Sequence, residues 1–420
     1  MAPASHNPRD GDGAAPGRVG YLESLRGLAC AQVLLLHALS AFAPRLTRFS
    51  TGTWGLADYV HASPLYFLYD GYAAVYLFFV LSGYVLAGAF ARQVDHPVRA
   101  FAARTLRLGV PALAALFLAA GVYSAFGGLN AAAGASLHSA FLGGGWTPTL
   151  SLGAILREGF VNALFVGYRG VGPYFSAPDW LAMGLDQSYD LPLWSLSYEL
   201  YGSVLVFALC WLRARDPRVA GVAAALLALH FSRSPFLLFV LGFGLRAFGL
   251  GARPLLRPAV AALAIAFGVG LCCAAEAFGA PLASGYCALD SFLLGPCRSP
   301  AALQKIFAAP LLFVGVVESP TMRRWLRAPA LGALGRMSFP LYLVHCPIIF
   351  GLGSFAALAL SPLLGWTTPY ATLALVVAGS VGMAALFAPL DALALQAARR
   401  VNATTRRRAN FSAAPEFELT

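Results

Sequence analysis

Residues 25–44 read LRGLACAQVLLLHALSAFAP, an apolar run that carries one charged residue, Arg26, and one histidine, His37. About 20 apolar residues cross the hydrocarbon layer of a bilayer as a helix, in which every backbone polar group bonds within the segment. Similar runs recur along the chain. With 59% apolar and 11% charged residues over 420 residues, the sequence predicts an all-α, polytopic integral membrane protein.

The number of apolar runs predicts about ten transmembrane helices. The 29 Lys and Arg residues gather mainly in alternate segments between the runs. Because basic residues favour the cytoplasmic side, both chain ends are expected in the cytoplasm. The net charge of +11 then reflects topology and contact with anionic lipids, so no nucleic-acid partner is expected. The runs lie near 25–44, 71–91, 108–127, 191–212, 219–232, 235–252, 258–280, 301–318, 338–360 and 370–398.

A single membrane domain is predicted over residues 20–398. It follows a disordered cytoplasmic tail, 1–19, and precedes a basic cytoplasmic tail, 399–420. The longest predicted loop, about 128–190, is expected outside. Its aromatic and acidic residues suit a sugar-like ligand, but packing of Trp and Tyr at the membrane interface explains them equally well.

The seven cysteines show no paired metal-ligand spacing, and no metal site is expected. Cys287 and Cys297 share a predicted external loop, where an oxidising compartment would permit a disulfide.

Ionisable residues inside predicted spans are the first candidates for function, because a charge in lipid is costly. Arg26 and His37 are eleven residues apart, about three helical turns, so they lie on one face of the first span. With the amino end inside, Arg26 is expected at the cytoplasmic boundary and His37 near the bilayer centre. Each also has a simpler interpretation, as an anchoring Arg and as a packed, hydrogen-bonded His.

Three residues on other spans are predicted at similar depth, namely Ser82, Glu199 and His345. A polar pocket around His37 is therefore plausible from depth, and a buried Glu or His there could act as a general base. Ser82 precedes a Gly, which is more typical of a helix-packing contact. The order of helices in the bundle cannot be read from one sequence, so depth alone does not predict contact.

Arg104 and Arg107 are spaced i, i+3 just before Pro111, where the third span is expected to start. Two guanidinium groups on one face can bind phosphates through paired hydrogen bonds. Anchoring on the positive side of the membrane explains them equally well. With Arg26 they form a predicted basic rim that suits an anionic cytosolic ligand.

Five segments, in order, resemble the membrane acyltransferase 3 family, which includes O-acetyltransferases of surface polysaccharides and related glycan acyltransferases. The first carries an Arg, ten residues and a His, which is similar to the family's signature. The resemblance extends directly over about 20–350, and the last apolar run agrees in position only. The segments are YLESLRGL (21–28) with His37, VYLFFVLSGY (75–84), RTLR (104–107) with Pro111, LWSLSYE (193–199) and LGRMSFPLYLVH (334–345).

The resemblance implies a membrane-bound O-acyltransferase of the plasma (inner) membrane. It implies transfer of an acyl group, typically acetyl, from cytosolic acyl-CoA to a hydroxyl of a glycan or glycoside acceptor. His37 would be the catalytic base or acyl relay, assisted by Arg26 and Glu199. Arg104 and Arg107, with Arg26, would bind coenzyme A phosphates. The pocket would be lined by Ser82, Trp194, Tyr198 and His345.

The sequence departs from the family at two positions. The family often has an acidic residue where Tyr76 stands and a His near Tyr72, which changes the expected polarity there.

A transporter or flippase for a lipid-linked or glycan substrate is the main alternative, because polar residues at mid-membrane depth also describe a substrate path. Against it, the chain has no repeated halves and no paired broken helices.

Overall fold

The computed structural model describes residues 20–47, 49–50, 58–61, 63–169, 181, 183–252, 255–277 and 300–403. Within these ranges the chain is almost entirely helical. The strands described there are a parallel pair of two residues each, β1 (Tyr168–Arg169) and β2 (Met183–Gly184). The predicted all-α class is confirmed. The predicted amino-terminal tail, most of the carboxy-terminal tail and the Cys287–Cys297 bridge lie outside the described residues.

Each of the predicted apolar runs falls on one or more helices. The long helices are α1 (Gly20–Phe42), α3 (Gly71–Phe90), α4 (Pro97–Phe126), α8 (Trp194–Arg215), α11 (Pro258–Ala277), α13 (Pro300–Glu318), α15 (Pro329–Ile348) and α17 (Thr368–Ala403). Shorter helices are α2 (Asp58–His61), α5 (Leu129–Leu137), α6 (Ala140–Gly143), α7 (Leu152–Arg157), α9 (Pro217–His230), α10 (Phe236–Ala247), α14 (Pro320–Trp325) and α16 (Ser354–Leu364). The 3₁₀ turns are η1 (Pro44–Leu46), η2 (Pro64–Tyr69), η4 (Leu185–Gln187), η5 (Leu191–Leu193) and η7 (Gly365–Thr367), and the π-helical segments are η3 (Glu158–Val166) and η6 (Ile349–Gly353).

Five helical stretches of the described chain are long and apolar enough to cross a membrane. The last of them contains α15, α16 and α17, which fold back on one another so that α15 packs against α17. The protein is therefore a membrane protein by the length and hydropathy of its helices. The stretches are Gly20–Phe42, Gly71–Phe90, Pro97–Phe126, Leu191–Arg215 and Pro329–Asn402. Ten crossings with both ends in the cytoplasm stay a prediction.

Helix α4 extends beyond the apolar run predicted at 108–127. The helix begins at Pro97, whose missing N–H costs nothing in the first turn, and Pro111 lies buried within it. Arg104 and Arg107 share this helix at the predicted i, i+3 spacing, and the point at which α4 enters the membrane stays a prediction. Both arginines lie inside α4, with side chains only 18% and 19% exposed.

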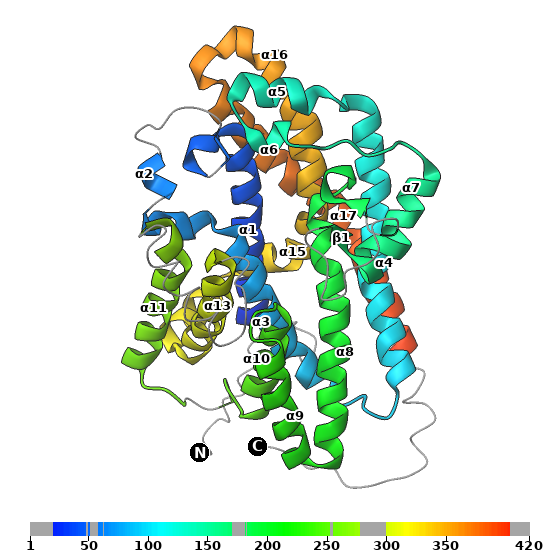
Figure 1. Ribbon diagram of the computed structural model, residues 1–420, viewed down its shortest axis with the longest axis vertical. Helices are drawn as coiled ribbons and strands as arrows, with labels where there is room; N and C mark the ends of the chain where they lie inside the picture. The colour runs from blue at the N-terminus through cyan, green and yellow to red at the C-terminus, as the bar shows by residue number, and fades with distance from the viewer. Residues whose placement is uncertain are drawn as a thin grey trace, which may run out of the picture.

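Helix α1 lies at the centre of the bundle, between α15 and α3 (Figure 1). The crossing of α1 and α15 depends on two glycines, because a methyl group on Gly27 would lie 2.6 Å from the backbone nitrogen of Gly335. Helix α3, in addition to its contact with α1, packs closely against α10 and α8. Helices α5, α6 and α16 cover one end of the bundle, and the α8–α9 turn lies at the opposite end (Figure 1).

The segment between α4 and α8, predicted as a loop, contains short helices held by a buried carboxylate. Glu158 is fully buried and accepts hydrogen bonds from Tyr168 Oη at 2.8 Å, Ser188 Oγ at 2.5 Å and the Tyr189 backbone N–H at 3.0 Å. Burial raises the pKa of Glu158, and the hydrogen bond from Ser188 counteracts that rise. This cluster fixes the end of the segment that leads into α8.

Candidate active site

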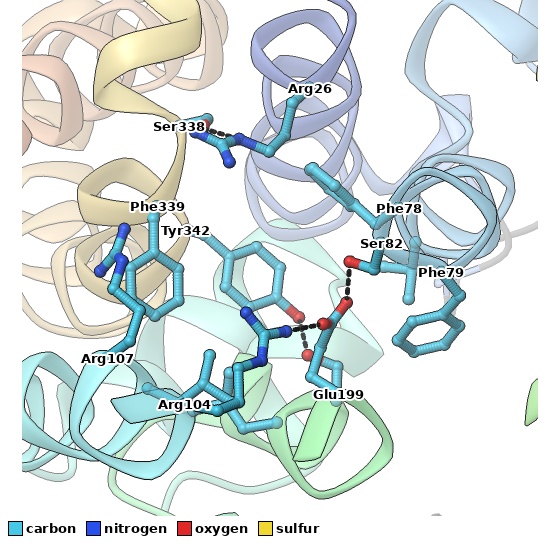
Figure 2. Close-up of a pocket in the computed structure, with 14 residues that line it drawn as sticks. Arg26, Phe78, Phe79, Ser82, Arg104, Arg107, Glu199, Ser338, Phe339 and Tyr342 are labelled. Atoms are coloured by element: carbon cyan, nitrogen blue, oxygen red, sulfur yellow. Dashed lines mark hydrogen bonds and ion pairs between the residues drawn. The ribbon is translucent and has the colours of Figure 1, made fainter. Parts of the chain in front are cut away.

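A pocket of about 140 Å³ lies between α1, α3, α4, α8 and α15 (Figure 2). Pockets that enclose a whole drug-sized ligand are larger, about 300–1,000 Å³, so this one suits one end of a ligand. Its polar lining consists of Arg26, Ser82, Arg104, Arg107, Ser195, Glu199, Ser338 and Tyr342, and its apolar lining of Val75, Phe78, Phe79, Leu108, Leu196 and Phe339.

Glu199 of α8 anchors one wall of this pocket. Its Oε1 accepts a hydrogen bond from Ser82 Oγ at 2.8 Å, and its Oε2 forms an ion pair with Arg104 (Figure 2). Arg104 Nε donates to Ser203 Oγ at 2.8 Å, and Ser203 Oγ in turn donates to the Glu199 backbone carbonyl at 2.5 Å. The guanidinium is therefore held in one orientation by α8. Ser82 does more than pack, because its hydroxyl binds the carboxylate.

Arg107 has an acidic partner that was not predicted from the sequence. Asp391 of α17 forms an ion pair with Arg107 Nη1, and its second oxygen lies 3.3 Å from Nη2. The guanidinium also lies 4.8 Å from the centroid of the Phe339 ring, a cation–π contact. The sequence does contain a sign of this ion pair, because Asp391 lies inside the apolar helix α17 and a carboxylate in such a helix usually has a partner.

Arg26 is the most exposed of the three arginines that line the pocket. Its side chain is 36% exposed, Nε donates to Ser338 Oγ at 2.9 Å, and Nη2 lies 3.8 Å from Glu23 Oε1. The close Gly27–Gly335 crossing places Arg26 beside Ser338. Each predicted cation of the rim thus has a carboxylate neighbour.

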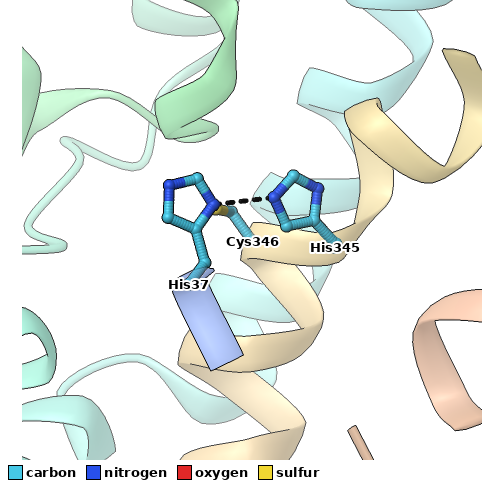
Figure 3. Close-up of side chains that lie close together, drawn as sticks. All are labelled: His37, His345 and Cys346. Atoms are coloured by element: carbon cyan, nitrogen blue, oxygen red, sulfur yellow. Dashed lines mark hydrogen bonds between the residues drawn. The ribbon is translucent and has the colours of Figure 1, made fainter. Parts of the chain in front are cut away.

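A second cluster contains His37 of α1 with His345 and Cys346 of α15 (Figure 3). His37 Nδ1 lies 2.8 Å from His345 Nε2 and 3.5 Å from Cys346 Sγ. The two imidazole rings are nearly parallel, at 9°, with centroids 5.1 Å apart, and they meet edge to edge through this contact, while Phe141 of α6 stacks on His37 at 5.4 Å. His345 is fully buried, whereas His37 is partly exposed.

These three side chains also offer the ligand types that zinc prefers, and they are the one such group among the described residues. Two nitrogens on a tetrahedral zinc ion, each about 2.0–2.1 Å from it, would lie roughly 3.3 Å apart. The observed 2.8 Å is the length of a direct hydrogen bond. The arrangement therefore fits a hydrogen-bonded imidazole pair better than a metal site.

The structure divides the single pocket expected around His37 into two clusters. Ser82 and Glu199 lie in the arginine pocket, and His345 lies with His37. Helix α15 connects the clusters, since Ser338 lines the pocket and His345 follows seven residues later, about 10 Å along the axis. Tyr342 lies between them, with its hydroxyl 2.8 Å from Ser195 Oγ and its ring 6.1 Å from that of His345.

Trp194 and Tyr198, predicted as pocket residues, are absent from the pocket lining. Their rings pack on each other with centroids 5.8 Å apart, and Tyr198 also packs against Phe79 and Phe236. They support the wall of the pocket from behind, because Phe79 itself lines it.

A model of a known family, described as an acyltransferase domain, matches residues 19–387. The chain belongs to this acyltransferase family. Comparisons with curated proteins and with solved structures gave no match. The family makes the protein an acyltransferase, in agreement with the resemblance seen in the sequence. Both clusters of the acyltransferase fall inside the matched region except for Asp391, which lies just beyond it.

Proposed function

We propose that this acyltransferase moves an acetyl group from cytosolic acetyl-CoA to a hydroxyl of a glycan or glycoside acceptor, at or across the plasma (inner) membrane. The observation that carries the proposal is the placement of two clusters on the same pair of helices. The arginine pocket lies toward the amino end of α1, and the imidazole pair lies toward its other end.

The arginine pocket is the proposed site of the donor. With ten spans and both ends in the cytoplasm, the Arg26 end of α1 faces the compartment that contains acyl-CoA. Arg26, Arg104 and Arg107 would bind the phosphates, because guanidinium groups bind phosphate oxygens in pairs. The small volume of the pocket suits the narrow pantetheine arm, which would extend past Tyr342 toward His37.

His37 is the proposed catalytic base. It removes the proton of the acceptor hydroxyl while the oxygen attacks the thioester carbonyl. The new C–O ester bond forms, the C–S bond breaks, and the proton passes to the departing coenzyme A sulfur. In the other open route, His37 carries the acyl group briefly before the acceptor takes it. The partial exposure of His37 supports access of the acceptor to its ring.

The proposal is tested with purified protein in lipid nanodiscs, radiolabelled acetyl-CoA and a panel of glycans. We expect acetyl transfer that depends on His37, so that His37→Ala abolishes it while leaving the protein folded. Mass spectrometry of surface glycans from cells with and without the protein would identify the acceptor by a missing acetyl mass. Wild-type transfer by His37→Ala would overturn the scheme. Uptake of substrate without acylation would instead support the transporter alternative.

A further inference from the structure

A chain of two hydrogen bonds runs from the α15 backbone to the proposed base. The backbone carbonyl of Leu341 lies 3.0 Å from Nδ1 of His345, and Nε2 of His345 lies 2.8 Å from Nδ1 of His37. His345 is completely buried, so neither of its nitrogens exchanges these partners for water. Neither contact belongs to the arginine pocket.

The chemistry of the end groups decides where the protons lie. A carbonyl oxygen can only accept, so Nδ1 of His345 must carry a proton. In a neutral imidazole the other nitrogen, Nε2, then has a lone pair. The 2.8 Å contact needs one proton between the two rings, and this proton must therefore belong to Nδ1 of His37. It follows that Nε2 of His37 has the free lone pair.

The alternative, a doubly protonated His345, would reverse the direction of the second hydrogen bond. It would bury a full positive charge between a backbone carbonyl and a neutral ring, which is costly without an ionised partner. A neutral His345 avoids this cost. Nε2 of His37 points away from His345 and Cys346 (Figure 3), and it forms no hydrogen bond to any described residue.

We propose that His345 is a positioning residue, which accepts the Nδ1 proton of His37 and so holds His37 in the tautomer whose Nε2 can take the acceptor's proton. The inference rests on the proposed function of His37 as the base. It gives His345 the task that a carboxylate performs beside the histidine of a Ser-His-Asp triad, but without a charge. Stacking of Phe141 on His37, with the two rings 9° from parallel, also restricts the orientation of the His37 ring.

Two substitutions of His345 separate positioning from packing. The carbonyl of Gln extends as far as Nε2 and can accept the proton of His37, whereas Asn extends only to Nδ1 and can bond only to Leu341. We expect His345→Gln to keep kcat within about 3-fold of wild type. We expect His345→Asn to lower kcat about 10- to 100-fold with little change in KM for donor or acceptor, as for other residues that orient a functional imidazole.

A spectroscopic measurement checks the same point without turnover. In protein labelled with ¹⁵N-histidine, His37 should give the Nδ1–H signal in the wild type and in His345→Gln, and a mixture of tautomers in His345→Asn. Equal kcat values for the Gln and Asn variants, or an Nε2–H signal for His37 in the wild type, would overturn the inference. Failure of the proposed function looks different, because His37→Ala would then stay active.

Discussion

Ser82 on α3 and Arg104 on α4 are joined through one side chain, the carboxylate of Glu199 on α8, which binds Ser82 through Oε1 and Arg104 through Oε2. Helix α8 therefore meets two consecutive helices, α3 and α4, that precede it by about 70 to 120 residues, at one charge. Because both ionised side chains are largely buried, the pair forms part of the structure of the pocket as well as its surface.

The ion pair between Glu199 and Arg104 should contribute strongly to stability. Glu199→Gln should lower the free energy of unfolding by about 3–5 kcal/mol, because it leaves the Arg104 charge buried without a partner. The double variant Glu199→Gln with Arg104→Gln should recover part of that loss, since the unpaired charge is then gone. Thermal unfolding in nanodiscs measures the stability of the single and the double variant. Additive losses in the double-mutant cycle would contradict the coupling.

Arg107 provides a test of donor binding. Arg107→Ala should weaken the binding of coenzyme A about 10-fold, the effect of losing one charged hydrogen bond. A titration with coenzyme A measures Kd. The matched control is Arg157→Ala, because Arg157 of α7 bonds to the Leu181 backbone carbonyl, away from the pocket. Unchanged affinity in Arg107→Ala would remove the assignment of Arg107 to the donor site.

Asp190 should make stability depend on pH. Neither of its side-chain oxygens has a hydrogen-bond partner in the described structure, and burial, with the charge of Glu158, raises its pKa well above 3.8. Since the folded state holds the proton more tightly than the unfolded state, stability falls as pH rises above about 4 toward the raised pKa.

The variant Asp190→Asn tests this directly, because an amide cannot ionise. Its unfolding temperature should fall less between pH 5 and pH 8 than that of the wild type. Part of the slope should persist, because burial also raises the pKa of Glu158. An identical slope in the two proteins would show that Asp190 does not titrate differently in the folded and unfolded states.

Removal of metal ions should leave activity unchanged. His37 and His345 bond directly to each other at 2.8 Å, a separation too short for two ligands of one tetrahedral ion. Dialysis against 1,10-phenanthroline followed by the acetyl-transfer assay measures the effect. Loss of activity that added Zn²⁺ restores would make His37, His345 and Cys346 a metal site.

The sequence predicted the helices well, because a long apolar run has few other ways to satisfy its backbone in lipid. It also predicted that Arg26 and His37 share a face, since both belong to one helix. It could not predict the partner of Arg107, because Asp391 lies 284 residues away and contact between helices leaves no periodic pattern. For the same reason the sequence predicted a similar depth for Glu199 and His345, which stays a prediction, but did not predict their separation into two clusters.

Trp194 and Tyr198 show why a sequence motif alone does not predict which of its side chains line a pocket. They belong to the same short motif as Glu199, yet successive helical residues point about 100° apart, so a motif does not place all its members in one pocket.

The close crossing of α1 and α15 at Gly27 and Gly335 bears on the length of the acyl donor that the proposed site can use. It fixes α1 against α15, so the separation of the arginine pocket from the imidazole pair, about seven residues of helix, cannot adjust to the substrate. Under the proposed function, a donor held by its phosphates in the pocket would deliver its carbonyl to His37 only if its arm had that length. The same backbone contact that packs two helices would then make the enzyme selective for the length of its carrier.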